Sequence, residues 1–221
     1  MGDAGATARA LAATVAPRAP GEGAALAAAA NAGIAALDPD MRADLRLLDV
    51  VRDTLPGALI VGDSTQLTYA GNLGFAARRA GGWFNSATGF GTLGYGLPAA
   101  IGAALAEGAP VVAISGDGGL QFCLGELASA VEAKARVILL LHDNQGYGEI
   151  KSYMVRNNIP PLGVDILTPD LAAIAQACRW QVERVATPAA LAQALGRAAQ
   201  TEGPVMVIFG DDLRAAAQAD L

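Results

Sequence analysis

Cysteine and histidine are scarce in this chain of 221 residues, which contains two cysteines and one histidine. Cys123 and Cys178 form no Cys-x-x-Cys pair, and His142 has no second histidine with which to bind a metal. The sequence therefore argues against a zinc site and against a disulfide scaffold. So few cysteines are typical of a reduced, cytoplasmic protein.

Long apolar runs and clusters of basic residues are also missing. The longest uncharged apolar stretches, such as 97–106 and 137–141, are too short to span a bilayer. Asp3 stands where a signal peptide needs positive charge, and Ala6 stands where a myristoylation motif needs Ser or Thr. The net charge of −6 makes nucleic acid and anionic membranes poor partners. We therefore expect a cytoplasmic protein with no nucleic-acid and no membrane partner.

The composition of the chain changes near residue 46. Residues 1–45 are rich in alanine and contain few large apolar side chains. They predict two short helices, at 6–15 and 24–37, around a linker and without a core of their own. Residues 46–221 alternate between apolar runs and helical patterns, and we expect them to form one folded domain.

Branched apolar runs and helical patterns follow one another through this second part. The runs predict strands at 58–63, 83–87, 110–118, 136–144, 180–185 and 204–212. The helical patterns lie at 94–108, 120–134, 170–178 and 188–199, and a last helix follows at the C-terminal end. Continuous apolar strands separated by helices predict an α/β fold, a doubly wound parallel sheet with helices on both faces. Its ligand site should lie beyond the carboxyl ends of the strands.

One predicted strand runs directly into the glycine-rich turn Gly116-Asp117-Gly118-Gly119. Glycines let the backbone turn tightly and come close to a ligand, and the helix that follows presents free N–H groups to a phosphate. A carboxylate at this place would repel the phosphate, unless a divalent cation lies between the two. The turn therefore predicts a phosphate and a cation together.

The next strand ends at Asp143-Asn144-Gln145-Gly146. Mg²⁺ prefers oxygen ligands in an octahedron and is commonly held by a few protein oxygens and by phosphate. The Asn144 carboxamide and the Gly146 carbonyl could join Asp117 around such an ion. Each turn by itself is also a common turn signal without a ligand, so the prediction rests on their occurring together.

Gly-Asp-Gly at 116–118, then residues 119–142, then a pair ending in Asn resembles the binding motif of thiamine-diphosphate enzymes. The resemblance implies that Asp117, Asn144 and the Gly146 carbonyl hold Mg²⁺ against the cofactor diphosphate. Two positions depart from the family pattern. Asp143 replaces the usual first Asn, and Gly119 replaces the usual Ser or Ala.

Two further segments carry the resemblance, which covers about residues 46–210. Residues 84–105 are similar to the stretch of acetolactate synthases that contacts the aminopyrimidine ring, and this implies roles for the Gly91 carbonyl and for the apolar Leu93. Residues 61–72 resemble the loop that contacts the diphosphate. The cofactor-binding residues implied are Ser64, Thr65, Gln66, Gly91, Leu93, Gly116, Asp117, Gly118, Gly119, Asn144, Gly146 and Tyr147.

The same resemblance implies a 2-oxo acid decarboxylase or an acetolactate synthase-like carboligase that is incomplete in this chain. In the family, a glutamate on a separate pyrimidine-binding domain, from the same gene or another subunit, activates the cofactor. Residues 1–45 resemble the end of a preceding domain and its linker. We expect no catalytic residue on this chain, inactivity alone, self-association, and a homodimer or tetramer in the complete enzyme.

The substrate is expected to be a 2-oxo acid, and the subgroup that the sequence resembles decarboxylates 5-guanidino-2-oxopentanoate. Glu149 is the candidate substrate contact, because it lies in the segment that borders the active site in relatives. Glu149 or Asp143 could pair with a guanidinium group. Both carboxylates also have readings that need no substrate.

Two alternatives remain open from the sequence. The first is a serine hydrolase that uses Ser64, for which His142 is the only available base. The second is a noncatalytic module that binds Mg²⁺ and a diphosphate. The dinucleotide and P-loop templates fail at the predicted phosphate turn, because Gly116-Asp117-Gly118-Gly119 is not a Gly-x-Gly-x-x-Gly sequence and no Gly-Lys-Ser/Thr sequence occurs.

Overall fold

The computed structural model describes residues 2–16, 21, 23–34, 36–107 and 110–219, which divide into two compact units between Ala36 and Leu37. The first unit contains α1 (Ala4–Thr14) and α2 (Gly23–Ile34). Asp3 caps α1, since its carboxylate accepts from the backbone N–H of Ala6 at 2.6 Å. None of the residues of α1 is buried. Two short helices without a core agree with the sequence-based expectation for this part.

The second unit begins earlier than residue 46, because α3 (Pro39–Thr54) belongs to it. Asp38 caps this helix by accepting from the N–H of Met41 at 2.9 Å. Ala43, Leu47 and Leu48 on its inner face are fully buried. No helix was predicted here from the sequence, and the predicted domain boundary after residue 45 falls inside α3. That residues 1–45 end a preceding domain stays a prediction.

All strands of the second unit form one six-stranded parallel sheet in the order β2-β1-β3-β4-β6-β5. The strands are β1 (Leu59–Gly62), β2 (Trp83–Asn85), β3 (Val111–Gly116), β4 (Val137–His142), β5 (Gln181–Arg184) and β6 (Val205–Phe209). Every residue of β4 and of β6 is buried. Strands buried on both faces explain the continuous apolar runs. The predicted doubly wound α/β sheet is confirmed.

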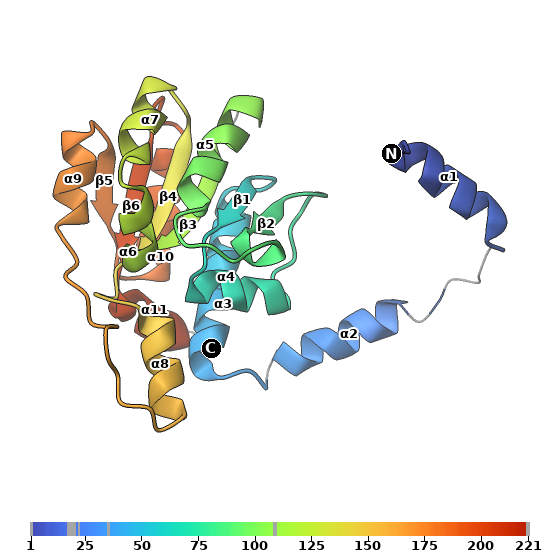
Figure 1. Cartoon of the computed structure of the whole chain (residues 1–221), viewed down its shortest axis with the longest axis horizontal. Helices are drawn as coiled ribbons and strands as arrows, with labels where there is room; N and C mark the ends of the chain where they lie inside the picture. The colour runs from blue at the N-terminus through green and yellow to red at the C-terminus, as the bar shows by residue number, and fades with distance from the viewer. Residues whose placement is uncertain (1, 17–20, 22, 35, 108–109, 220–221) are drawn as a thin grey trace. The chain divides into compact units, whose positions relative to one another are not determined.

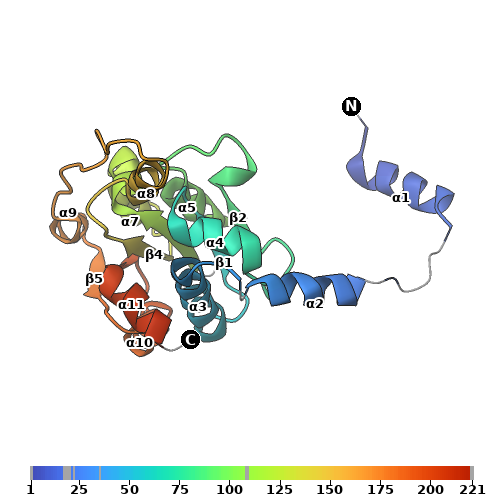
Figure 2. The ribbon, with the colours of Figure 1, turned by 90° about the horizontal axis from the view of Figure 1, so that it is seen from below.

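Helices cover both faces of this sheet (Figures 1 and 2). The helices after α3 are α4 (Gln66–Gly74), α5 (Gly96–Glu107), α6 (Asp117–Leu120), α7 (Glu126–Glu132), α8 (Gly148–Arg156), α9 (Leu171–Ala177), α10 (Pro188–Ala198) and α11 (Asp211–Ala219). Buried side chains of α5, α7 and α9 share one core cluster with the strands. On the other face α3 packs against α4, α10 and α11.

Two helical regions differ from the sequence-based expectation. The single helix expected at 120–134 is divided into α6, the 3-10 turn Gln121–Cys123 and α7. Gly118, Gly119 and Gly125 in this stretch have poor helix propensity, which weakens a continuous helix. Helix α8 was not predicted, because its sequence of nine residues is short. None of its residues is buried.

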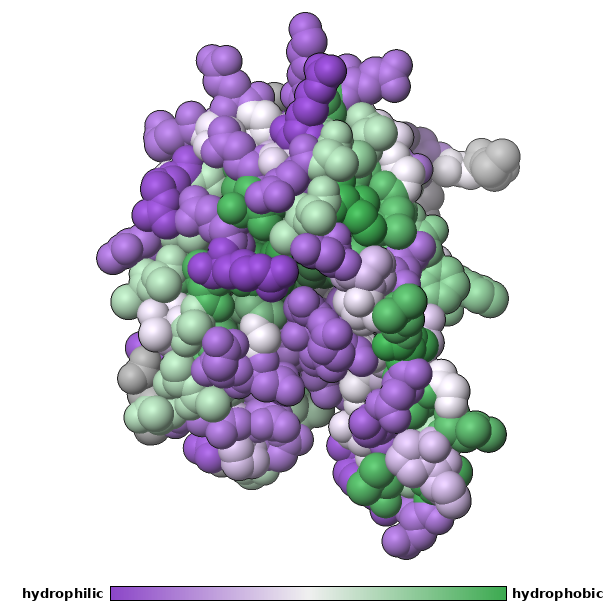
Figure 3. Space-filling view, turned by 90° about the vertical axis from the view of Figure 1, so that its left-hand side faces the viewer, coloured by the Kyte–Doolittle hydropathy of each residue, from purple (hydrophilic) through white to green (hydrophobic). Residues whose placement is uncertain are grey.

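Helix α8 and the loop after it carry an exposed apolar surface. The exposed large apolar side chains there are Ile150, Tyr153, Val155, Ile159, Leu162 and Leu167. Figure 3 shows hydrophobic side chains among hydrophilic ones on the projecting lower part of the face that it displays. Within the part of the chain that the structure describes, no helix is long and apolar enough to cross a membrane.

A buried ion pair joins the first helix of the second unit to its last. The guanidinium of Arg214 on α11 donates to both carboxylate oxygens of Asp44 on α3, at 2.9 and 3.1 Å. Asp44 is 1% exposed and Arg214 is 8% exposed. Burial raises the pKa of Asp44 to about 6, although Arg214 lowers it.

This pKa predicts a pH dependence of stability. Between the ordinary pKa of 3.8 and the folded pKa of about 6, the folded state keeps a proton on Asp44 that the unfolded state has released. The free energy of unfolding should therefore lose a contribution of up to about 3 kcal/mol as the pH rises through this window. Urea unfolding at several pH values in the wild type and in Asp44→Asn measures it, because the difference between the two curves isolates Asp44.

The exposed Asp53 provides a control, because its pKa is shifted in the direction opposite to that of Asp44. Hydrogen bonds from Arg52 and Arg78 lower the pKa of Asp53 to about 2, so its contribution is present above the ordinary value and lost as the pH falls. Asp53→Asn should leave the slope between about pH 4 and pH 6 unchanged. Parallel stability curves for the wild type and Asp44→Asn across that window would contradict the assignment.

Candidate cofactor site

A cavity of about 230 Å³ opens at the carboxyl ends of β1, β3 and β4. The chain leaves β1 toward β2 on one side of the sheet, and β3 lies on the other side of β1, so this is a topological switch point. The lining residues are Ser64, Thr65, Gln66, Tyr69, Gly91, Leu93, Gly116, Gly118, Gly119, Asn144, Gly146, Tyr147, Gly148, Glu149 and Ile150. All residues expected to bind the cofactor are among them except Asp117, which is fully buried beside Asn144.

The three residues expected to bind a metal converge on one point. One terminal atom of the Asn144 carboxamide lies 2.9 Å from Oδ1 of Asp117 and 3.0 Å from the carbonyl oxygen of Gly146. Both neighbours are hydrogen-bond acceptors. Without a cation this terminal atom must therefore be the amide nitrogen, whereas a cation between the three would allow the amide oxygen to take its place.

The spacing of these atoms fits a small, hard cation. Adjacent ligands of an octahedral Mg²⁺ ion lie about 3.0 Å apart when each bond is about 2.1 Å long. The separations of 2.9 and 3.0 Å match that value. The donor set is one carboxylate, one amide and one carbonyl, and among the described residues no group of three His, Cys, Asp or Glu side chains could hold a metal. Such a set suits Mg²⁺ better than zinc.

Thr168 completes the surroundings of Asp117. Its hydroxyl donates to Oδ2 of Asp117 at 2.6 Å, so that the other oxygen, Oδ1, faces Asn144. Thr168 lies far from Asp117 in the sequence, in the segment between α8 and α9. The sequence analysis missed it, because Leu167-Thr168-Pro169-Asp170 looks like an ordinary helix start.

Close packing at Gly146 and Gly148 excludes a side chain at either position. A Cβ on Gly146 would lie 2.7 Å from the backbone carbonyl of Val164, and a Cβ on Gly148 would collide with the Asn144 carboxamide. The turn also contains Gln145 at φ 60°, a left-handed conformation that few residues other than glycine adopt. These constraints fix the direction of the Gly146 carbonyl and of the Asn144 side chain.

Asp143, the departure from the family pattern, faces away from the cavity. Its carboxylate accepts from the Gln145 side chain and lies 3.9 Å from Arg184 on β5. It lines a separate small hollow together with Arg184 and Phe209. The negative charge of Asp143 is therefore paired outside the proposed metal site.

A buried carboxylate holds the loop before α5 against the end of β1. Asp63 is fully buried and accepts from the N–H groups of Ser64 and Gly94 at 2.7 and 3.0 Å. It also accepts from the Ser115 hydroxyl at 3.3 Å. Burial raises the pKa of Asp63, against the effect of these donors. The sequence alone did not predict this role of Asp63.

The Ser64 hydroxyl adds a second link to the same loop. It donates to the Gly91 carbonyl at 2.9 Å and lies 2.8 Å from the Ser86 hydroxyl. Gly91 and Gly94 adopt φ of 75° and 79°, so the loop bends where a side chain would be strained. The bend brings Leu93 to the cavity wall, where the resemblance expects it.

Glu149 lines the cavity at the start of α8. Its carboxylate accepts from the Gln66 amide at 3.4 Å and lies 3.5 Å from the Arg156 guanidinium. Gln66 in turn accepts from Arg214 at 3.3 Å. Glu149 is thus placed where a ligand could reach it, and a polar chain links it to the buried ion pair.

The serine-hydrolase alternative lacks its catalytic pair. His142 is 1% exposed, stacks on Phe209 with ring centroids 4.8 Å apart, and bonds to Asp211 at 3.1 Å. Ser64 bonds to Ser86 and to the Gly91 carbonyl instead. No hydrogen bond joins Ser64 to His142 among the described residues, and this alternative is set aside.

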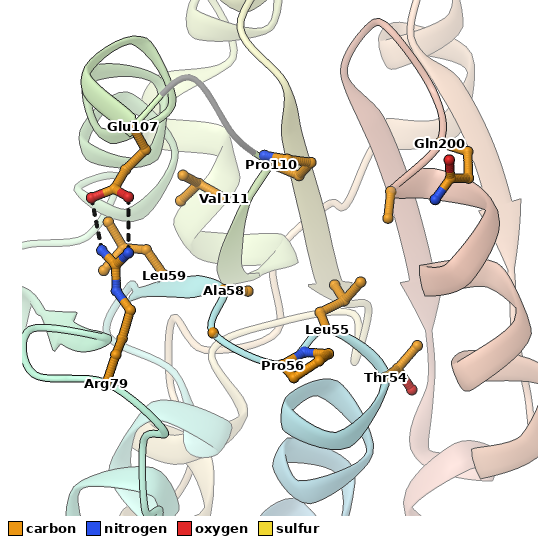
Figure 4. A pocket seen from close by; sticks show the side chains of 12 residues that line it. Thr54, Leu55, Pro56, Ala58, Leu59, Arg79, Glu107, Pro110, Val111 and Gln200 are labelled. Atoms are coloured by element: carbon orange, nitrogen blue, oxygen red, sulfur yellow. Dashed lines mark hydrogen bonds and ion pairs between the residues drawn. The ribbon is translucent and has the colours of Figure 1, made fainter.

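A second cavity, of about 380 Å³, lies at the opposite ends of the strands (Figure 4). Apolar residues such as Leu55, Pro56 and Val111 line it, and Arg79 donates to Glu107 at its edge with distances of 2.7 and 2.9 Å. None of the residues expected to bind the cofactor or metal lines this cavity.

Comparison with known proteins agrees with this geometry. The family described as thiamine pyrophosphate enzyme, C-terminal TPP binding domain, matches residues 63–209. The chain belongs to the thiamine pyrophosphate enzymes. The match begins at Asp63 and ends at the last strand, so it contains every segment that lines the candidate site. The fold and the family expected from the motifs are confirmed.

Several relatives of this thiamine pyrophosphate enzyme domain are 2-oxo acid enzymes. The chain is 42% identical to a probable 2-ketoarginine decarboxylase of Pseudomonas aeruginosa over 59% of its own length and 24% of that protein. It is 34% identical to acetolactate synthase of Bacillus subtilis over 52% of the chain and 20% of that enzyme. The chain therefore spans about a quarter of the length of these relatives or less.

A solved structure supports the same placement. The thiamine diphosphate-dependent 4-hydroxybenzoylformate decarboxylase of Rhodococcus jostii RHA1 superposes with a TM-score of 0.67 at 28% identity. The superposition covers 78% of this chain and 32% of that one. The second unit thus has the architecture of one domain of a larger decarboxylase.

Proposed function

We propose that this chain is the thiamine diphosphate- and Mg²⁺-binding portion of a 2-oxo acid decarboxylase or an acetolactate synthase-like carboligase. The observation that carries the proposal is the convergence of Asp117, Asn144 and the Gly146 carbonyl at the edge of the cavity, with separations that suit an octahedral ion. Bound there, thiamine diphosphate would supply the electron sink that loss of CO₂ from a 2-oxo acid requires.

The residues of this chain would bind and orient the cofactor. Asp117, Asn144 and Gly146 hold the metal against the diphosphate. Ser64, Thr65 and Gln66 offer hydroxyl and amide groups, and the glycines of the Gly116–Gly119 turn leave the backbone open to the diphosphate. The Gly91 carbonyl and the Leu93 side chain lie on the remaining wall, where a polar acceptor and an apolar contact can orient the pyrimidine and the centre of the cofactor.

A second domain would complete the active site. The carboxylates near the cavity are already engaged, Asp117 by Thr168 and Glu149 by Gln66 and Arg156. We infer that the activating glutamate comes from a pyrimidine-binding domain of the same gene or of another subunit, in a homodimer or tetramer. Phe90 is 98% exposed on the loop before α5, and apolar side chains are exposed on α8. Exposed apolar surface around a cavity is typical of a surface that contacts another domain.

The proposed substrate class is supported by the relatives and by the position of Glu149. The relative that is 42% identical is named for a 2-oxo acid with a guanidino group. The Glu149 carboxylate at the cavity wall could accept hydrogen bonds from such a group. We therefore propose 5-guanidino-2-oxopentanoate as the first 2-oxo acid to test with the complete enzyme.

A noncatalytic module that binds Mg²⁺ and the cofactor is the second candidate. It is favoured because the two carboxylates described near the cavity both have partners within the chain, Asp117 with Thr168 and Glu149 with Gln66. The two candidates differ in one result, because only the first gives CO₂ from a 2-oxo acid once the pyrimidine-binding domain is supplied.

Calorimetric titration of the chain with thiamine diphosphate tests the proposal. With Mg²⁺ present we expect saturable binding, and with a chelator we expect affinity lower by about tenfold or more, because the diphosphate then meets Asp117 without a cation between them. Where no heat is observed, the titration is repeated with the preceding domains restored. Continued absence of binding there would overturn the assignment.

A further inference from the structure

The segment of residues 157–170 runs from α8 to α9 (Figure 1). It contacts both turns that hold the expected metal ligands. The buried Val164 accepts from the N–H of Tyr147 at 2.9 Å, which ties the segment to the Asn144–Tyr147 turn. Thr168 donates to Oδ2 of Asp117 at 2.6 Å. Two loops that are distant in the sequence are therefore held by one segment.

The backbone around Thr168 is fixed on both sides. Pro169 restricts the residue before it to an extended conformation. Asp170 caps α9, since its carboxylate accepts from the N–H of Ala173 at 3.0 Å. Upstream, the backbone carbonyl of Val164 accepts from the N–H of Tyr147. The hydroxyl of Thr168 is thus presented to Asp117 by a backbone with little freedom.

The hydrogen bond decides how Asp117 can bind a metal. A hydroxyl donating to a carboxylate oxygen at 2.6 Å is a short, charge-assisted bond. It occupies Oδ2 and leaves Oδ1 toward Asn144 and the Gly146 carbonyl. This arrangement favours binding of a cation through Oδ1 alone, because the bond to Thr168 opposes a rotation of the carboxylate that would bring Oδ2 to the same ion. One-oxygen binding suits the strict octahedron of Mg²⁺, whereas Ca²⁺ accepts carboxylates through both oxygens and more ligands in total.

The geometry points to Thr168 as a positioning residue that fixes Asp117 as a one-oxygen ligand and so selects Mg²⁺ over Ca²⁺. This inference rests on the proposed function, because it concerns the metal of the same site. It assigns to Thr168 a role in metal choice that its place in an ordinary helix start does not suggest.

Calorimetric titration tests this role. It measures the affinity of the full chain for Mg²⁺ and for Ca²⁺ in the presence of saturating thiamine diphosphate. Thr168→Val removes the hydroxyl and keeps the branched shape, and we expect its affinity for Mg²⁺ to fall about tenfold. Its affinity for Ca²⁺ should fall less or rise, because Oδ2 becomes available. The ratio of the two affinities is the decisive readout, since a general loosening of the loop would weaken both metals alike.

Two companion variants and one control sharpen the experiment. Thr168→Ser retains the hydroxyl and should keep the wild-type preference for Mg²⁺. Thr168→Ala removes it without bulk and must behave like the valine variant, which keeps the test decisive if valine disturbs folding. Thr201→Val is the matched control, because the Thr201 hydroxyl donates to the Arg197 carbonyl after α10, away from the cavity. It should change neither affinity.

The outcomes separate this inference from the proposed function. Metal-dependent binding in the wild type together with unchanged preference in Thr168→Val and Thr168→Ala overturns the role of Thr168 alone. Equal losses for both metals, or the same loss in Thr168→Ser, also overturn it. Absence of any metal-dependent binding in the wild type, both in the chain alone and with the preceding domains restored, overturns both proposals together.

Discussion

Asp117→Ala should abolish Mg²⁺-dependent binding of thiamine diphosphate, with a loss of affinity of at least about 100-fold. Asp117 is the one carboxylate among the three converging ligands, whereas Asn144 and the Gly146 carbonyl are neutral. Its removal would leave Asn144 and the Gly146 carbonyl, two neutral donors, to hold a strongly hydrated cation. Such a cation gives up its water reluctantly without a charged ligand.

The calorimetric titration with and without Mg²⁺ measures this effect. Asp117→Asn should lose less affinity than Asp117→Ala, because a neutral oxygen remains in place. Asp143→Ala is the matched control: its carboxylate lies on the neighbouring turn but faces Arg184, so its removal should change the affinity only about two- to threefold through the lost charge. Equal losses in Asp117→Ala and Asp143→Ala would show that net charge, not a metal ligand, governs binding.

Much of this site could be predicted because the sequence carries it at strand ends. The apolar runs before Gly116 and before Asp143 indicate adjacent strands, and parallel strands end at one edge of the sheet. That rule brings Asp117 and Asn144 together without any knowledge of side-chain contacts. The structure adds the reason for a glycine at 146, because it leaves no room for a Cβ against the carbonyl of Val164.

Thr168 and Asp63 could not be predicted in the same way. The bond from Thr168 to Asp117 depends on the path of the whole segment 157–170, which has no periodic pattern. Asp63 precedes a helix, so a capping role explains it from local sequence alone. The structure shows instead that it bonds to Gly94 across the cavity wall. Contacts between distant loops leave no local signal.

The fold was predicted more completely for strands than for helices. The strands are buried on both faces, and their apolar runs mark them directly. Helix α3 was missed because its buried face begins with Ala43, and one more alanine is not distinguishable from the alanine-rich sequence before it. Helix α8 was missed because it has only nine residues. Its apolar residues Ile150, Tyr153 and Met154 recur at helical spacing, but so short a segment does not stand out as a periodic pattern.

Arg214→Met should lower the free energy of unfolding by about 3–5 kcal/mol near neutral pH, the largest effect on stability that we expect of any single substitution. Arg214 bonds both oxygens of Asp44, and Asp44 is 1% exposed. Its replacement by methionine keeps the volume but leaves a buried carboxylate without a counter-charge. The cost is the penalty of burying that charge, because the pair itself contributes little beyond its own desolvation.

The pH dependence of this loss distinguishes an unpaired charge from a packing defect. The pKa of Asp44 is already raised to about 6 by burial, and Arg214 lowers it, so the loss of Arg214 must raise it further. Asp44 would then take up a proton near neutral pH. The destabilisation should therefore be largest at about pH 8 and smaller at about pH 5, where the carboxyl group is neutral. A packing defect would cost the same at both.

Urea unfolding of two further variants separates the loss of the buried charge from the loss of any arginine. Arg197→Met removes an arginine that pairs with Glu183 at the surface, where its side chain is 59% exposed, and it should change the free energy of unfolding little. The double variant Asp44→Leu/Arg214→Met removes both charges and should recover most of the lost stability, because two apolar side chains can fill the same space. A double variant as unstable as Arg214→Met would show that α3 and α11 depend on the ion pair itself.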